Sequence, residues 1–462
     1  MILSQNRIKY VLFHLSQHWH ECDEVSDKFC FVDESDFDTI TLQNKIIFRL
    51  SESETIEPLT INMLDSDIPI LYSIAKTQET LFYLDANNNL IFTHDYLKSS
   101  FYLLSGLQEI ETDKKDFIGR FPFSESIQKK VNCVTIPVVN YYFEIIIQGL
   151  ELFCSHHKIN FKRKRLFDNF GFFLSHDVDQ IAFYHVRETA FKLKQLLGLS
   201  PLIFSKPLTF KLFLKGLVYL INPFPKKDPW WNFDEMTALE KGLRIRSAFY
   251  FLKHEHCNMD SRCYFDNPKI KTLIKSLKND GFEVGLHGTI LSAENEESLL
   301  RQTNEFVEIY GEMHCGIRQH FLRFIHPKTF ALQQKAGFKY DTTLAFAEHD
   351  GYRNSYCYPF RPYDFENDKM FDIWEIPLTM MEVSVLNYRK LNFDGLKNAA
   401  FHLIDEAHKF GGLFSLLWHN SRLTEYEYPG VQEFYKELLE QIVEEKPAVF
   451  TGEEFIKLKV EN

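Results

Sequence analysis

Two carboxylates follow a short apolar run in the stretch GFFLSHDVDQ, residues 171 to 180. The run Phe172 to Leu174 gives way to polar residues, which is the pattern of a buried strand that ends at a polar site. Asp177 and Asp179 are two positions apart, so on an extended backbone both carboxylates leave the same face. Two like charges this close are costly unless a cation lies between them or one carboxylate binds a proton. The spacing therefore indicates a metal ion or acid/base chemistry, and a turn with two solvated acids is the alternative.

Four later apolar runs also end in side chains of the kinds that bind metals or move protons. These side chains are His287 in EVGLHG, Arg318 and His320 in GIRQHFLRF, Glu375 in WEIP and His419 in LLWHN. A single histidine at a strand end is more often a hydrogen-bonded core residue than a ligand. In parallel β/α folds, however, the carboxyl ends of the strands converge on one site, so these residues would meet in one pocket.

The elements that would position these residues form a β/α pattern from about residue 166 onward. We expect strands at 171–179, 245–252, 282–288, 314–322, 372–380 and 412–420. Helical patterns lie between them, at 267–281, where Gly281 occupies the place of a C-terminal stop, at 297–311 and at 393–412. Strands separated this regularly by helices predict a parallel sheet, either closed as a barrel or left open.

Residues 1–165 differ from the rest in being rich in short alternating runs, which predicts a smaller α+β domain of unknown role. The three asparagines at 87–89 lie between two apolar runs and signal a hairpin. The basic segment 158–168 marks the expected boundary, so the β/α pattern would form a second domain over 166–462. No catalytic group of residues stands out in the N-terminal part.

One insertion interrupts the β/α pattern at about 187–229. It is basic and aromatic, with leucine and phenylalanine at helical spacing. A helical excursion packed on the barrel is the ordinary interpretation. A helix that lies on a membrane surface, giving peripheral membrane contact, and a lid are the alternatives.

Composition limits the function classes that remain. The chain has 462 residues and a formal net charge of -12, which argues against a nucleic-acid binder because phosphate contacts need clustered lysine and arginine. Its eight cysteines have no close pairs, so they do not form a disulfide framework and fit a reducing compartment. We read no signal peptide and no run of 18 apolar residues, and therefore expect a cytoplasmic protein without a transmembrane segment.

Three further clusters have residue types that suit a ligand. Cys154, His156 and His157 precede the basic segment, where a solvated linker is the commoner use. His254, His256, Cys257 and Cys263 have the types of a second metal site but irregular spacing. The segment 340–364 is dense in aromatic and hydrogen-bonding groups, which suits a sugar-contacting loop or a packed surface loop equally.

Residues from about 166 to 462 resemble the polysaccharide deacetylases, which are metal-dependent carbohydrate esterases built on a distorted (β/α)7 barrel. The resemblance is carried by SHDVD, EVGLHG, GIRQHF and LLWHN. A bacterial branch of this family carries an extra N-terminal domain, as this chain would. The resemblance implies four roles: Asp177 as general base, Asp179 as metal ligand, Arg318 as the arginine that pairs with the base, and His419 as general acid.

The chain departs from the family pattern after His287, which matches the first metal-binding histidine of the family. The family has a second one four residues on, where this chain has Leu291 with Ser292 beside it. Catalytic zinc usually keeps three protein ligands, so Asp179 and His287 alone would be too few. His320 is the best substitute because it lies two residues after the matched arginine, on the same face.

The resemblance implies a metal-dependent hydrolase that removes N-acetyl groups from a sugar of a bacterial glycan or glycan precursor. Its cofactor would be a divalent metal, zinc before others, and its partner a carbohydrate substrate. Because the second histidine is missing, one alternative is a catalytically impaired protein that binds glycan or serves as a scaffold. A hydrolase of another C–N amide bond is the second alternative.

Overall fold

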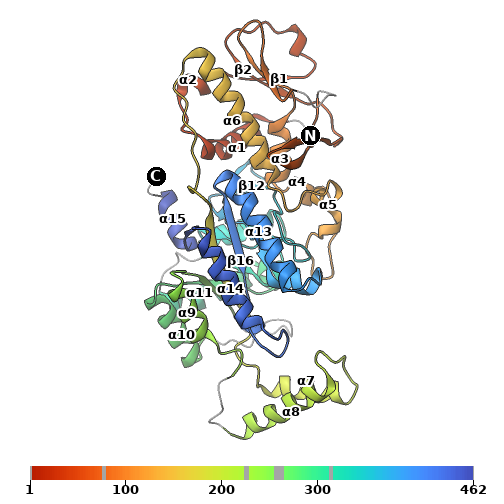
Figure 1. The fold of residues 1–462 in the computed structure, drawn as a ribbon, viewed down its shortest axis with the longest axis vertical. Coiled ribbons are helices and arrows are strands. Elements are labelled where there is room, and N and C mark those ends of the chain that lie inside the picture. The colour runs from red at the N-terminus through yellow and green to blue at the C-terminus, as the bar shows by residue number, and fades with distance from the viewer. Residues whose placement is uncertain (1–2, 75–79, 223–227, 254–264, 312–315, 461–462) are drawn as a thin grey trace.

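A computed structural model describes residues 3–74, 80–222, 228–253, 265–311 and 316–460. A curled parallel sheet forms its centre (Figure 1). The strands follow the order β14 (Trp374–Glu375), β11 (Tyr340–Asp341), β10 (Ile317–Gln319), β9 (Glu283–Gly288), β8 (Ala248–Leu252), β7 (Gly171–Val178), β16 (Leu413–Leu417) and β15 (Met380–Met381), and β17 (Ala448–Val449) also pairs with β7. Every pairing in this sheet is parallel, and β14 and β15 lie at its two edges. The predicted α/β architecture, a distorted barrel, is confirmed.

Helices cover the outside of this sheet. They are α9 (Phe233–Gly242), α10 (Pro268–Asn279), α11 (Glu296–Tyr310), α12 (Lys328–Lys335), α13 (Phe393–Phe410), α14 (Val431–Glu444) and α15 (Gly452–Val460). Local signals fix their ends: α10 starts with a proline after Asn267, whose side chain accepts a hydrogen bond from the Lys269 amide, and Gly281 follows it at φ +84°. Helix α13 ends at Gly411, at φ +66°, where a Cβ atom would lie 2.3 Å from the Phe167 carbonyl oxygen.

A second, mixed sheet lies in the N-terminal part. Its order is β1 (Phe29–Asp33), β2 (Ile46–Leu50), β6 (Leu90–Phe92) and β5 (Phe82–Leu84), and β3 (Leu59–Met63) forms a separate hairpin with β4 (Ser66–Ile70). Strands β5 and β6 are antiparallel around residues 87–89, as the three asparagines predict. The helices of this part are α1 (Gln5–Leu15), α2 (Asp23–Ser26), α3 (Tyr96–Leu104), α4 (Leu107–Ile110), α5 (Ile127–Lys130) and α6 (Val138–His157). The division into two domains at residue 165 stays a prediction.

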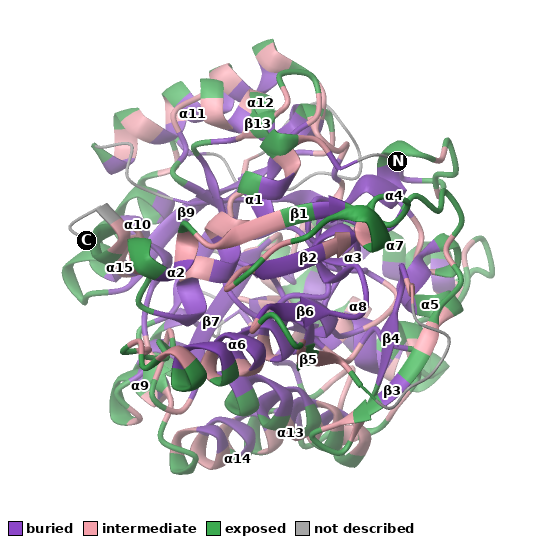
Figure 2. Ribbon diagram, turned by 90° about the horizontal axis from the view of Figure 1, so that it is seen from above, coloured by how far each residue is buried: buried purple, intermediate pink, exposed green. Residues whose placement is uncertain are grey.

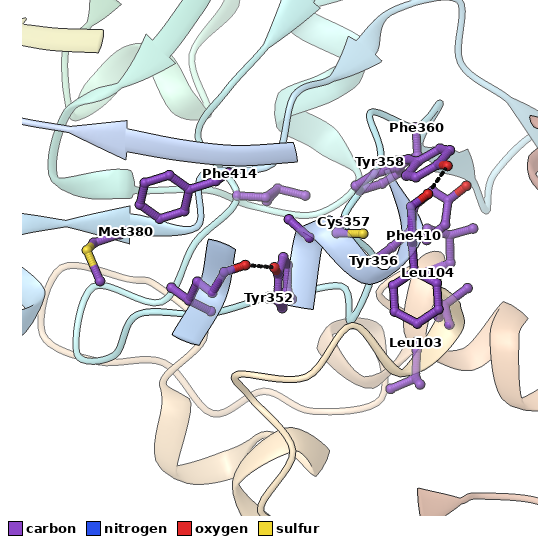
Figure 3. Packing of buried hydrophobic residues seen from close by; sticks show 14 of the residues in the cluster. Leu103, Leu104, Tyr352, Tyr356, Cys357, Tyr358, Phe360, Met380, Phe410 and Phe414 are labelled. Carbon is purple, nitrogen blue, oxygen red and sulfur yellow. Dashed lines mark hydrogen bonds between the residues drawn. The ribbon is translucent and has the colours of Figure 1, made fainter. Parts of the chain in front are cut away.

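The segment 340–364 begins in β11 and lies largely in the interior of the protein. Tyr352, Tyr356 and Tyr358 are each at most 1% exposed, and Figure 3 shows them packed with residues from α3 and α13. Arg353 donates to both carboxylate oxygens of Glu109 on α4, at 2.8 and 2.6 Å. Its aromatic side chains are buried, so the segment is not a surface loop, whereas a contact with a sugar stays a prediction, since Ala347 lines the cavity described below.

The insertion forms a helical hairpin of α7 (Val186–Leu196) and α8 (Lys206–Ile221). In Figure 1 it projects from the body at the bottom. Figure 2 shows buried residues gathered on the strands at the centre of the body. Across the described parts of the chain, no helix has the length and apolar character needed to cross a membrane.

Glu283, at the start of β9, lies in the core with Tyr250 and Tyr340. Tyr340 donates to its carboxylate at 2.6 Å and the two tyrosine hydroxyls lie 2.8 Å apart. Burial raises the pKa of Glu283 to about 7, against an ordinary value near 4.5, although the hydrogen bond from Tyr340 opposes this. Because the folded state holds this proton more tightly, the side chain stabilises the fold fully below pH 4.5 and loses that contribution as pH rises through 7.

The substitution Glu283→Gln is therefore expected to make stability less dependent on pH. Between pH 5 and 8, the free energy of unfolding should fall by about 2.5 kcal/mol less in the variant than in the wild type. Urea unfolding at several pH values measures this difference, and Glu297→Gln, at an exposed position, is the matched control. If the free energies of unfolding of the wild type and of Glu283→Gln change with pH in parallel, this carboxyl does not titrate in that range.

Candidate functional site

Asp177 and Arg318 form a buried pair at the carboxyl end of the central sheet. Asp177 lies near the end of β7, and its Oδ1 accepts a hydrogen bond from Arg318 Nη1 on β10 at 2.9 Å. Arg318 is fully buried, donates also to Ser175 and Thr342, and lies over the Tyr250 ring at 4.7 Å. With its donors satisfied in this way, the guanidinium holds the carboxylate in one orientation.

Asp179, His287 and His320 form the candidate metal site. One ligand atom from each lies within 4.8 Å of the others, and no other such group occurs among the residues that the structure describes. His287 Nδ1 donates to the Arg318 carbonyl oxygen at 2.9 Å, which leaves its Nε2 directed at Asp179 Oδ1, 3.2 Å away. A neutral histidine with this tautomer is the form that binds a metal.

These donors fit a divalent cation. Asp179 Oδ1 is buried and accepts no hydrogen bond, which is costly unless a positive charge meets it. One carboxylate oxygen and two imidazole nitrogens are a ligand set that zinc and similar ions use. Leu291 is 49% exposed and offers no ligand atom, and the Ser292 hydroxyl is bonded to Thr289 and Gln319. The geometry therefore fits His320 as the third metal ligand, rather than a weakened site with only Asp179 and His287.

The turn that carries His320 is braced by the N-terminal part. Strand β10 ends at Gln319, and Phe321 and Leu322 then adopt positive φ angles of 59° and 55°, which is rare for such residues. Arg120 Nη1 donates to the Phe321 carbonyl oxygen at 2.9 Å, and Arg323 Nε donates to the Ile118 carbonyl oxygen at 2.8 Å. Contacts from residues 118–120 thus help to hold the backbone that positions the third donor.

His419 is paired with a glutamate that the sequence interpretation missed. Its Nδ1 lies 2.7 Å from Glu382 Oε1, and its Nε2 lies 3.6 Å from Asp179 Oδ2. Burial disfavours the charged imidazole, but the negative charge of Glu382 and its hydrogen bond outweigh burial and raise the pKa of His419 to about 9. At neutral pH this histidine therefore carries a proton that it can donate. The one signal for Glu382 was an acid directly after the apolar run that ends at Met381.

The candidate base, the three candidate ligands and His419 line one cavity of about 540 Å³. Its lining includes Asp177, Asp179, His287, His320 and His419. Trp230, Phe191 and Ile203 supply apolar surface on the side of the hairpin, whereas Trp231 packs on Phe233 instead. The volume lies in the range of cavities that hold small ligands.

Several other candidate residues lie away from this cavity. Glu375 is buried on β14 opposite Asp341 of β11, and its Oε1 accepts from the Leu344 amide at 3.0 Å. His156 and His157 at the end of α6 contact Asn88 at 3.1 and 3.2 Å. The cluster His254, His256, Cys257 and Cys263 lies outside the described residues.

Comparisons with known proteins find distant similarities. Residues 2–154 match a family of unknown function, DUF7033, and no curated protein matches the chain. A candidate polysaccharide deacetylase from Mycobacterium smegmatis is similar in structure, with 14% identity, a TM-score of 0.41, and coverage of 63% of this chain and 91% of that one. A CE4 family pseudoenzyme from Bacillus anthracis is also similar, with 8% identity, a TM-score of 0.31, and coverage of 62% and 66%.

A third similar structure is a peptidoglycan N-acetylglucosamine deacetylase, with 10% identity, a TM-score of 0.32, and coverage of 62% of this chain and 88% of that one. At these scores the likeness decides nothing about activity, and these proteins include both an enzyme and a pseudoenzyme.

Proposed function

We propose that this chain is a metal-dependent hydrolase that removes the N-acetyl group from a sugar of a bacterial glycan or glycan precursor. The observation that supports it is the convergence of three different functions in one cavity. Asp177 can accept a proton, His419 can donate one, and Asp179 with His287 and His320 can hold a cation. A protein that only binds glycan has no need for this combination of base, acid and ligands.

Asp177 is the proton acceptor in this proposal. Arg318 holds one of its oxygens, and the other lies 3.5 Å from His287 Nε2, at the edge of the candidate metal site. A divalent cation, when bound, would supply positive charge that polarises an acetamide carbonyl and acidifies a water. Asp177 takes a proton from a water molecule while the oxygen of this water attacks the carbonyl carbon of the acetamide.

His419 completes the reaction as proton donor. As the C–N bond breaks, the departing nitrogen takes the proton from His419 Nε2, and Glu382 on the other ring nitrogen stabilises and orients the imidazolium. Water and the acetamide are thereby converted into acetate and a free amine. The apolar wall of Phe191, Ile203 and Trp230 suits one face of a sugar ring.

Metal analysis tests this proposal against the non-catalytic alternative. The purified chain should bind about one zinc per molecule, and His320→Ala should weaken zinc affinity by roughly 100-fold, since one of three protein ligands is removed. His402→Ala, at an exposed position, is the matched control. Competition against a chelator gives the affinity. Absence of zinc binding at any loading, or unchanged affinity in His320→Ala, would contradict this site.

A substrate comparison separates the proposed reaction from hydrolysis of other C–N bonds. Acetate release from N-acetylated amino sugars and ammonia release from small amides are measured on the zinc-loaded protein. Acetate release supports the deacetylase, and ammonia release in its absence supports the other hydrolase. Neither product, with zinc bound, would favour a glycan-binding protein with this fold.

A further inference from the structure

The hairpin α7–α8 has an unusual distribution of polar and apolar residues. The hairpin buries five polar or small residues and one leucine, which are Thr189, Lys192, Gln195, Thr209, Gly216 and Leu212. Gln195 donates to the Pro201 carbonyl oxygen at 2.6 Å, and Thr209 to the Ser205 carbonyl oxygen at 3.0 Å. A Cβ atom on Gly216 would lie 2.4 Å from Thr189 Oγ1, so the helices approach closely.

Most of the other large apolar residues of the hairpin are exposed. On α8, Phe210, Leu214, Leu217 and Ile221 follow helical spacing and are between 38% and 83% exposed. Val186 and Leu193 of α7, Leu197 after its end, and Leu199 and Leu202 of the turn are exposed as well. Helices in water usually bury most of their apolar side chains, and exposed apolar residues in this number mark an interaction surface.

Charge narrows the kind of partner. Residues 186–221 contain six lysines and arginines and one glutamate, a net charge of +5, in a chain whose net charge is -12. Arg187, Lys194, Lys206, Lys211 and Lys215 are exposed beside the apolar residues. A second copy of the hairpin would bring two such positive sets together, which is unfavourable. Acyl chains bordered by anionic headgroups complement both the apolar stripe and the cations.

Hydrogen bonds connect the hairpin and the residues that flank it to the rest of the protein, next to the candidate site. Asp228 accepts hydrogen bonds from the amides of Phe183 and Tyr184 at 2.9 and 3.0 Å, and Lys215 donates to the Tyr426 hydroxyl at 3.2 Å. Phe191 and Ile203 of the hairpin also line the cavity that contains Asp177. A surface that binds the outer face of the hairpin would therefore lie close to that cavity.

We propose that the hairpin α7–α8 docks on the surface of a membrane that contains anionic lipids. Its exposed leucine, phenylalanine and isoleucine side chains enter the boundary of the acyl chains, and its lysines lie at the level of the phosphates. This docking is a property of the hairpin and does not depend on the proposed reaction. It brings the cavity to the level of the headgroups, where a sugar carried by a membrane lipid would be within reach.

Vesicle flotation of the full chain tests the docking. The wild type should float with vesicles made of equal parts phosphatidylglycerol and phosphatidylcholine, and should bind at least tenfold more weakly to phosphatidylcholine alone. The triple change L214Q, L217Q and I221Q should weaken binding at least tenfold, because it removes three of the four exposed apolar residues named on α8. The triple change K194Q, K206Q and K211Q should weaken binding to the anionic vesicles about a hundredfold, at roughly fivefold for each lysine.

The matched control is the triple change I40Q, I110Q and F117Q, which alters three exposed apolar residues outside the hairpin and should leave flotation unchanged. Circular dichroism and thermal melts of each variant check that the fold is retained. The proposal is overturned if the wild type does not float, or if the three glutamines on α8 leave flotation intact. A third result would also overturn it. If the wild type does not bind vesicles, and light scattering finds a dimer that the three glutamines dissociate, a second copy of the chain covers the exposed apolar residues of the hairpin.

Discussion

Asp177→Asn is expected to lower kcat/KM for acetate release from an N-acetylated amino sugar about a thousandfold. Asparagine has nearly the same shape as aspartate, and its amide oxygen can still accept the 2.9 Å hydrogen bond from Arg318. What it cannot do is take a proton from water at neutral pH. Because the candidate ligands Asp179, His287 and His320 are untouched, zinc should bind at the same stoichiometry.

The metal content decides how a loss of activity is to be interpreted. If zinc is lost together with activity, Asp177 serves as a ligand and the assignment of a base is wrong. If activity is normal, another group accepts the proton. Asp364→Asn is the matched control, since Asp364 is also buried but accepts its hydrogen bonds from the amides of a turn far from the cavity. That variant should keep full activity and full zinc.

Long apolar runs made much of the fold predictable. The stretch 171–179 contains β7 and its neighbouring polar end, and 245–252, 282–288 and 412–420 contain β8, β9 and β16. These strands are buried on both faces, so hydrophobic content alone reveals them. Strands of two residues, such as β11, are formed only by pairing with neighbours and leave no periodicity to detect.

The run 372–380 shows where such a prediction fails. It was expected to be one strand, but it forms β14 and the start of β15, which lie at opposite edges of the sheet. Pro377 lies between them and cannot donate a ladder hydrogen bond. Glu375 lies opposite Asp341 of β11 and is absent from the cavity lining, and the acid that contacts His419 is Glu382, seven residues later.

The position of His320 in the candidate metal site is set by a turn and not by the alternation of side chains along a strand. Its expected position rested on alternation with Arg318 along one strand, yet β10 ends at Gln319 and His320 begins a tight turn. The positive φ angles of Phe321 and Leu322, and the hydrogen bond from Arg120, set its place. These are long-range constraints, since Arg120 and Phe321 are 201 residues apart in sequence. The braced turn also gives the N-terminal part a positioning role.

His419→Ala is expected to affect substrates according to their leaving groups. For an N-acetylated sugar, whose amine must be protonated to depart, kcat/KM should fall about a thousandfold. For an aryl acetate, whose phenolate leaves without a proton, the fall should stay within about tenfold. Measuring both substrates on the same zinc-loaded preparations gives the ratio directly, and His402→Ala, with its exposed imidazole, is the control.

Glu382 sharpens this prediction, because it acts through His419 rather than on the substrate. Its carboxylate lies 2.7 Å from His419 Nδ1 and raises the pKa of His419 to about 9 against the effect of burial. Glu382→Gln keeps a hydrogen-bonding group but removes the charge, so it should lose roughly 10- to 100-fold on the sugar and little on the aryl acetate. Equal losses on both substrates, for either variant, would mean that His419 supports the structure or the metal instead of protonating the departing amine.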